Sequence, residues 1–184
     1  SWFHFDISGD DITPWLTGVA GLNDIAANAL TSTETRPRVL RRGNNLIMTL
    51  RGLSIGSEHG SEEMISVRLW TDGKRIISSR LKPLASTQTV IDALKAGEGA
   101  VNTPELIVNW VECITDDMAG AISSLEEQVD SIVDLVDTMD VAAARQSIIG
   151  LRQRAMLLRR YLSPQREALS KLSSENLSWL DEYS

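Results

Sequence analysis

The sequence predicts an α+β fold, in which an N-terminal α/β layered domain with a mixed sheet is followed by long antiparallel helices. Short strand-like and helix-like segments alternate in the first hundred residues, as expected for a layered sheet. A glycine-rich joint follows at residues 97–102, and beyond it apolar residues recur every three or four positions, which is helical spacing. We therefore expect an α/β domain over residues 1–100, and a long helical hairpin with the start of a third helix over residues 101–184.

Five strands are predicted in the first part from runs of aromatic, β-branched and other apolar residues. The dipeptide Asp72-Gly73 lies between the last two runs and is typical of a tight hairpin turn. A short helical stretch is expected near Pro14, because proline suits the first turn of a helix. The predicted strands span residues 2–6, 39–40, 46–50, 65–70 and 75–79, and two longer helices span residues 23–30 and 86–95.

Two long apolar stripes predict the helical hairpin. Thr103 and Pro104 suit the cap and the first position of the first helix, and a turn is expected near Asp140. Each helix would extend roughly 50 Å, so part of the hairpin should project from the domain or meet another subunit. In the second helix, Pro164 is expected to cause a kink near Tyr161. The stripes are Leu106, Trp110, Ile114, Met118, Ile122, Leu125, Val129, Ile132, Val136 and Met139, and Ile148, Leu151, Ala155, Leu158, Leu162, Leu169 and Leu172.

The composition is that of an ordinary folded protein, and it argues against a nucleic-acid partner and against cysteine-based sites. A net charge of -7 disfavours nucleic acid, because nucleic acid binds basic surfaces. A single cysteine, Cys113, rules out an internal disulfide and a multi-cysteine zinc motif. No run approaches the roughly 18 apolar residues that a spanning helix needs, and strand-like sequence starts directly after Ser1. We therefore expect a fragment whose membrane contact is made through segments missing from this chain.

The predicted hairpin carries its charges in two separate blocks. No lysine, arginine or histidine occurs between Lys95 and Arg145, whereas acidic residues recur throughout that interval. Like charges on one helical face destabilise an isolated helix by about 0.2–0.5 kcal/mol per pair, so a compensating partner is expected. Carboxylate clusters suit hard cations such as Mg²⁺, and suit zinc less well. The candidate metal ligands on this face are Glu126, Glu127, Asp130, Asp134 and Asp137.

The second helix of the hairpin carries the opposite charge. Arginines recur at every seventh position from Arg145, a spacing that drifts only about 20° per repeat and keeps them on one side. One interpretation is a solvated acidic helix paired with a solvated basic helix through ordinary salt bridges. A second is that the acidic face concentrates divalent cations, and a third is that arginines bind chloride or another anion. The candidate anion-binding residues are Arg152, Arg159 and Arg166.

A second candidate metal site lies in the first predicted strand. His4 and Asp6 share one face of that strand, and both residue types are acceptable zinc ligands. A lone histidine in a strand is more often a packed or hydrogen-bonded residue, and Cys113 is expected to be a small core residue. No catalytic triad has local support and no phosphate-binding loop of standard spacing occurs, so we expect that the chain is not an enzyme.

Five segments follow one another in the order found in a known family. Residues 2–6 resemble its first strand, and residues 35–38 and 50–52 resemble its paired central strands. Residues 77–80 resemble the strand after its hairpin, and residues 159–166 resemble its proline-containing helix, which is the most specific of the five. Through these segments the chain resembles the zinc-transporting ZntB branch of the CorA family of divalent metal ion transporters, over essentially its whole length.

The resemblance implies the cytoplasmic funnel domain of a zinc transporter, assembled as a homopentamer in the bacterial inner membrane. Zn²⁺ or another divalent cation would then be the transported or regulatory ion, and the domain would contribute to assembly and to cation attraction or sensing. The pore would lie in membrane helices that follow a stalk helix, so no pore residue is assigned here. The alternative function is that of a soluble interaction protein, α/β plus coiled coil, with no role in transport.

Overall fold

The predicted mixed sheet is confirmed. The computed structural model of the chain describes residues 1–33, 36–54, 63–135, 141–175 and 177–180. The strands of its sheet are β1 (Trp2–Asp6), β2 (Arg38–Arg42), β3 (Asn45–Leu53), β4 (Met64–Thr71) and β5 (Ile76–Arg80). They lie in the order β1-β5-β4-β3-β2, with β1 parallel to β5 and every other pair antiparallel. Each predicted strand overlaps an observed one.

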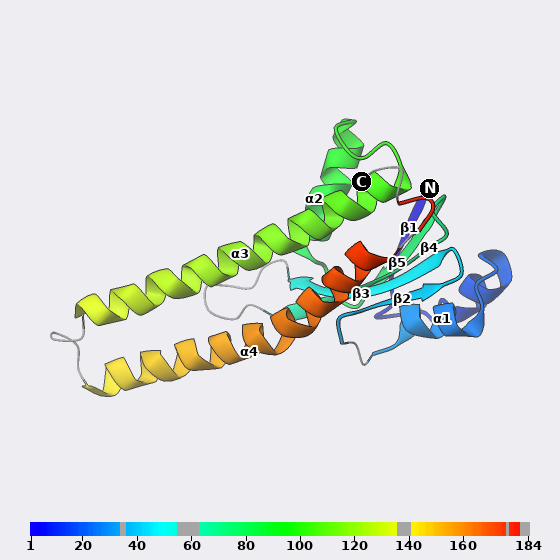
Figure 1. Ribbon diagram of the computed structural model, residues 1–184. Coiled ribbons are helices and arrows are strands. Elements are labelled where there is room, and N and C mark those ends of the chain that lie inside the picture. Colours follow the sequence, from blue (N-terminus) through cyan, green and yellow to red (C-terminus); the bar gives the residue numbers. More distant parts are fainter. Residues whose placement is uncertain (34–35, 55–62, 136–140, 176, 181–184) are drawn as a thin grey trace.

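Helices cover both faces of the sheet (Figure 1). The π-helical turn η1 (Trp15–Val19) and the helix α1 (Asp24–Thr31) cover one face, where Leu16 and Leu30 pack against Ile47, Trp70 and Ile77. The other face is covered by α2 (Ala85–Ala96), by the first half of α3 (Thr103–Leu135) and by part of α4 (Val141–Ser174). Because both faces are covered, the central strand β4 is buried along its whole length.

Side-chain caps begin two of the helices. Asn23 Oδ1 accepts a hydrogen bond from a backbone N–H in the first turn of α1, at 2.9 Å. In α3, Asn102 Oδ1 accepts from the N–H of Glu105 at 2.9 Å, so the cap is Asn102 and Thr103 is the first helical residue. The prediction that Thr103 is the cap was wrong by one position. The carboxylate of Glu105 also accepts a hydrogen bond from the N–H of Val101, so hydrogen bonds in both directions join the first turn of α3 to the residues before it.

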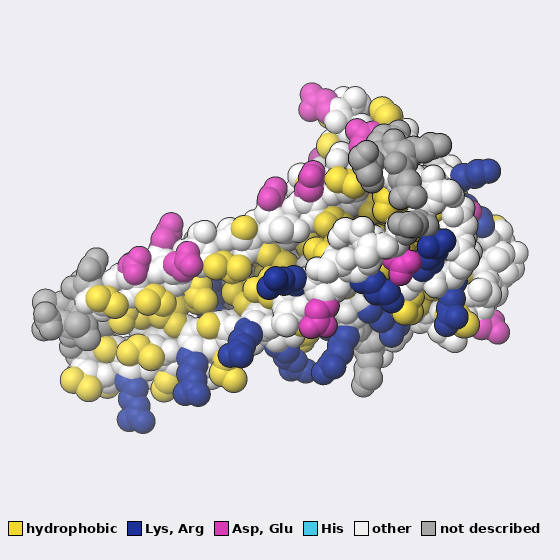
Figure 2. All heavy atoms as spheres, in the orientation of Figure 1, with side chains coloured by type: hydrophobic (Ala, Val, Ile, Leu, Met, Phe, Trp, Pro, Cys, Tyr) yellow, Lys and Arg dark blue, Asp and Glu magenta, His cyan; other side chains and the backbone are white. Residues whose placement is uncertain are grey.

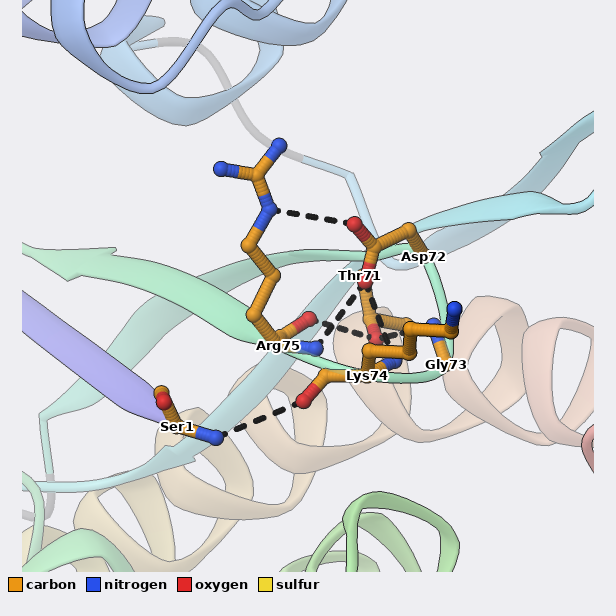
Figure 3. Close-up of polar contacts among 6 residues, drawn as sticks. All are labelled: Ser1, Thr71, Asp72, Gly73, Lys74 and Arg75. Atoms are coloured by element: carbon orange, nitrogen blue, oxygen red, sulfur yellow. Dashed lines mark hydrogen bonds and ion pairs between the residues drawn. The ribbon is translucent and has the colours of Figure 1, made fainter.

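The Asp-Gly turn between β4 and β5 forms the predicted hairpin (Figure 3). Asp72 Oδ1 accepts from the N–H groups of Lys74 and Arg75 at 3.0 and 2.9 Å, and Asp72 Oδ2 lies 3.0 Å from Arg75 Nε. The hydroxyl of Thr71 accepts from the N–H of Gly73 and donates to the carbonyl of Arg75. Gly73 has a φ of 86°, a left-handed conformation that favours glycine.

The C-terminal tail returns to the sheet and contacts this hairpin. Residues 177–180 form a turn, in which Leu177 is fully buried. Trp179 lies so close to Gly73 that a Cβ at Gly73 would clash with its ring, and its Nε1 donates to the carbonyl of Asn44 at 2.8 Å. A third helix was predicted here, but the described part of the tail is this turn, and residues 181–184 lie outside the described residues.

The predicted antiparallel hairpin is formed by α3 and α4, which extend together away from the sheet (Figure 1). The start of the first stripe, Trp110, Ile114 and Met118, belongs to the core of the sheet, and later residues of α3 face α4. The division of the chain at residue 100 stays a prediction, since α3 shares this core. α4 continues through Pro164 as one helix, and the turn predicted near Asp140 lies outside the described residues.

One buried side chain fastens α4 to the sheet edge. The ladder between β2 and β3 ends at the pair Arg38 and Thr49, so the peptide groups of Arg51, two residues further along β3, have no strand partner on the β2 side. Gln165 of α4 takes that place: its Oε1 accepts from the N–H of Arg51 at 2.7 Å, and its Nε2 donates to the carbonyl of Arg51 at 3.0 Å. Its Nε2 also lies 3.2 Å from the sulfur of Met118 on α3.

We expect the substitution Gln165→Met to lower the free energy of unfolding by about 1–3 kcal/mol, because it keeps the side-chain volume but leaves the buried peptide groups of Arg51 without the carboxamide. Urea denaturation with an unchanged m value measures this difference. The matched control is Gln153→Met on the exposed face of the same helix, which should stay within about 0.5 kcal/mol of the parent. Equal stability of both variants would show that the hydrogen bonds of Gln165 do not hold α4 in place.

Candidate functional site

The predicted acidic face lies on the projecting end of α3. Glu126, Glu127 and Asp130 are exposed to solvent there. Asp134 belongs to the last turn of α3, but its side chain is not described, and Asp137 lies outside the described residues. Figure 2 shows the acidic side chains along the outer edge of α3, with hydrophobic atoms filling the seam toward α4.

The predicted basic residues lie on the opposite edge of the hairpin. Arg152, Arg159 and Arg166 are exposed along α4, where basic side chains line its outer edge (Figure 2). In the described part of the chain, no ion pair joins these three arginines to Glu126, Glu127 or Asp130. A polar contact between the helices is made instead by Arg154, whose Nη1 donates to Gln128 Oε1 at 2.6 Å. The acidic and basic faces are therefore two separate charged edges.

His4 takes part in a hydrogen-bond network at the edge of the sheet. Its Nε2 accepts from Arg80 Nε at 3.0 Å, and its Nδ1 lies 2.7 Å from Ser78 Oγ. Because arginine can only donate, Nε2 carries the lone pair and Nδ1 the proton. Ser78 Oγ also accepts from Trp2 Nε1 at 2.7 Å and lies 3.4 Å from the carbonyl of Phe3, to which it donates. Both imidazole nitrogens are engaged, so a metal at Nε2 would have to displace Arg80.

Asp6 contacts the same arginine. Its Oδ2 lies 3.2 Å from Arg80 Nη1, an ion pair without the alignment of a hydrogen bond. The hydroxyl and N–H of Ser8 donate to Asp6 Oδ1 at 2.5 and 2.9 Å, and these hydrogen bonds hold the pKa of Asp6 below its ordinary value. Burial, and secondarily the charge of Arg80, lower the pKa of His4 to about 4. His4 is therefore a neutral imidazole at physiological pH.

The structure does not bring the two candidate metal sites together. His4 and Asp6 lie on β1, whereas the acidic residues lie on the projecting hairpin. Among the described residues, no group of three or more histidine, cysteine, aspartate or glutamate side chains is arranged to hold a metal ion. None of the helices in the described ranges is both long enough and apolar enough to span a bilayer. The metal-ligand assignments stay predictions.

The structure also shields two arginines from solvent, to different degrees, that the sequence analysis did not select as site residues. Arg68 on β4 is 1% exposed, and none of its three guanidinium nitrogens has a hydrogen-bond partner in the described part of the chain. Arg51 on β3 is half-buried, with its guanidinium carbon 4.1 Å from the centre of the Tyr161 ring on α4. The sequence did hold a signal for them, since each lies within an apolar strand run. An arginine in such a run indicates a special site, because arginine is rarely buried without a partner.

The neutral state of His4 predicts a pH dependence of stability. In the unfolded chain His4 binds a proton near pH 6.5, whereas the folded protein resists protonation down to about pH 4. The free energy of unfolding should therefore fall as the pH drops through this window, by at most about 3 kcal/mol. Urea denaturation between pH 7 and 4 measures this slope. It should flatten in His4→Gln and persist in His59→Gln, which removes the other histidine; an unchanged slope in His4→Gln would contradict the prediction.

Comparison with known proteins gives relatives along the whole chain. A divalent cation transporter, CmaX, of Pseudomonas aeruginosa is 35% identical over 183 residues, and a zinc transport protein, ZntB, of Yersinia enterocolitica is 31% identical over 183 residues. Each alignment covers 98% of this chain and 55% of the relative. The chain therefore spans about half the length of the curated relatives that it matches.

Solved structures agree with the fold. The structure of full-length CmaX superposes with a TM-score of 0.85 at 34% identity, covering 97% of this chain and 55% of that chain. The ZntB cytoplasmic domain from Vibrio parahaemolyticus gives a TM-score of 0.80 over 99% of this chain and 72% of that one; at 22% identity it shows the fold alone. The family described as CorA-like Mg²⁺ transporter protein matches residues 1–184. The expected resemblance is thus confirmed, and the chain belongs to the CorA-like transporter family.

Proposed function

We propose that this chain is the cytoplasmic part of a divalent cation transporter of the bacterial inner membrane, and that it acts in assembly and in attracting or sensing cations. The observation that carries the proposal is the family match over residues 1–184, together with relatives named as a divalent cation transporter and as zinc transport proteins. The family is one of transporters, so the chain is not an enzyme, as the sequence predicted. This membership also argues against the alternative of an interaction protein without a role in transport.

Zinc is the proposed cargo, with other divalent cations as alternatives. The ZntB relatives support zinc by name, whereas the name of CmaX specifies divalent cations in general. The exposed acidic residues Glu126, Glu127 and Asp130 favour any divalent cation, because carboxylates alone do not select zinc. Selectivity for one metal ion is therefore assigned to other parts of the transporter. The role proposed for the acidic face is to raise the local cation concentration.

Self-association is supported by apolar side chains on the projecting hairpin. Val133 and Met156, on opposite helices, are 64% and 61% exposed, and Val129 and Ile148 are also exposed. An apolar stripe of this kind on a long hairpin is expected to pack against another copy of the chain. We propose a homopentamer, in which the acidic and basic edges would set the potential near the ion path. As part of the same proposal, the basic edge would bind chloride at Arg152, Arg159 or Arg166.

Neutralising the acidic face should reduce cation uptake. We expect Asp130→Asn, Asp134→Asn and Asp137→Asn together to lower the initial rate of zinc uptake by about two- to fivefold at low ionic strength, since the face then attracts fewer cations. The effect should shrink as salt rises. The measurement is uptake into proteoliposomes that contain the protein expressed from its whole coding sequence, with Zn²⁺, Mg²⁺ and Co²⁺ compared.

The control removes three exposed carboxylates elsewhere, by Asp10→Asn, Asp24→Asn and Glu98→Gln, and should leave the rate unchanged. An equal loss of uptake rate in both triple variants would show that the effect comes from the net charge of the protein and not from the acidic face. An uptake rate that the first triple variant does not change would contradict the role of the acidic face, whereas the absence of any divalent cation uptake would contradict the proposed function itself.

A further inference from the structure

A basic cavity opens at the sheet edge, next to the point where β2 begins. It has a volume of about 660 Å³ and lies between the segment after α1, the end of β3 and α4. None of the candidate site residues that the structure describes lines it. The lining residues are Thr33, Arg36, Arg51, Arg160, Tyr161, Pro164 and Glu167.

The lining carries more positive than negative charge. Among the described residues that line it, three carry a guanidinium group and one, Glu167, carries a carboxylate, which gives this described lining a net charge of about +2. The guanidinium carbons of Arg51 and Arg160 lie 4.1 and 5.5 Å from the centre of the Tyr161 ring, so two cations share one aromatic ring. In the described part of the chain, no ion pair connects Glu167 with Arg36 or Arg160. The cavity therefore concentrates positive charge.

Behind this lining lies the buried Arg68. The register of the sheet sets Arg68 opposite Thr49 and Ser79, and sets Arg51 two residues from Thr49 on the same face. The guanidinium nitrogens of Arg68 and the hydroxyl of Thr49 are buried, and none of these atoms has a hydrogen-bond partner in the described part of the chain. Burial, and secondarily the charge of Arg51, lower the pKa of Arg68. A buried cation without a compensating charge destabilises the fold, so a negative charge nearby would stabilise Arg68 and Arg51 together.

We propose that this cavity binds an oxyanion of the phosphate class, held by Arg36, Arg51 and Arg160. Guanidinium groups present planar pairs of donors that match phosphate oxygens, which a spherical halide cannot use in pairs. The net charge of the lining equals in size that of hydrogen phosphate, and the volume accommodates a group larger than one halide ion. The three arginines come from three segments, so the bound anion would tie α4 to the sheet beside the Gln165 contact.

The test is isothermal titration calorimetry of the chain with inorganic phosphate at constant ionic strength. We expect saturable binding that Arg160→Gln weakens by about tenfold, since one charged hydrogen-bonding group is lost. Arg166→Gln removes the same charge from an exposed position on the same helix outside the cavity, and should change the affinity less than about twofold. A parallel titration with ATP separates the two sources of phosphate: tighter binding of ATP indicates a nucleotide, and tighter binding of phosphate indicates the free ion.

Three outcomes would overturn the proposal: no saturable binding of phosphate or ATP, an equal loss of affinity in Arg160→Gln and Arg166→Gln, or equal competition by chloride. A second measurement addresses Arg68 through thermal unfolding with and without phosphate. Arg68→Met should raise the unfolding midpoint in phosphate-free buffer, because it removes an uncompensated buried charge, and should reduce the rise that phosphate produces in the parent. A lower midpoint with an unchanged phosphate effect would contradict the role of Arg68.

Discussion

The rest of the structure depends on the apolar stripe of α3, because two different partners share it. Its first turns, with Trp110, Ile114 and Met118, close the core over one face of the sheet. Further along, the same stripe faces α4 and becomes the seam of the projecting hairpin. Because α3 is one continuous helix, the position of its first turns on the sheet also fixes the direction in which the hairpin projects (Figure 1). Any rotation of α3 would have to disturb the core and the seam together.

The seam also explains why the charges occupy opposite edges. Apolar residues take the facing sides of α3 and α4, so the acidic and basic side chains are left on the outer edges, where the described residues on each side do not form ion pairs across the seam. Exposed pairs would contribute little to stability in any case. Separated charge, by contrast, produces a potential that extends over about a Debye length, and in an assembly of several copies such edges would add up.

Polar groups decide how the hairpin is attached to the sheet. Gln165 supplies the hydrogen bonds that a longer β2 would have made with Arg51, and it does so from within α4. The same short second strand leaves room for the cavity between the segment after α1 and α4. The attachment of α4 and the presence of the cavity thus have the same cause, which is that the β2–β3 ladder stops at Arg38 and Thr49. This region combines a buried amide whose hydrogen bonds are satisfied with the guanidinium of Arg68, for which the described residues provide no hydrogen-bond partner.

The sequence by itself determined the strands, the helices that precede the C-terminal tail and the Asp72-Gly73 hairpin, because periodicity and turn chemistry are local and act over a few residues. Helical spacing also placed Glu126, Glu127 and Asp130 on the exposed surface of α3, and Arg152, Arg159 and Arg166 on that of α4. Only the tertiary structure decided that β1 pairs with β5, that Arg80 contacts both His4 and Asp6, and that Arg68 is buried and Arg51 half-buried. These features depend on contacts between residues far apart in the chain, and a one-residue change in register would turn the same side chains to the opposite face.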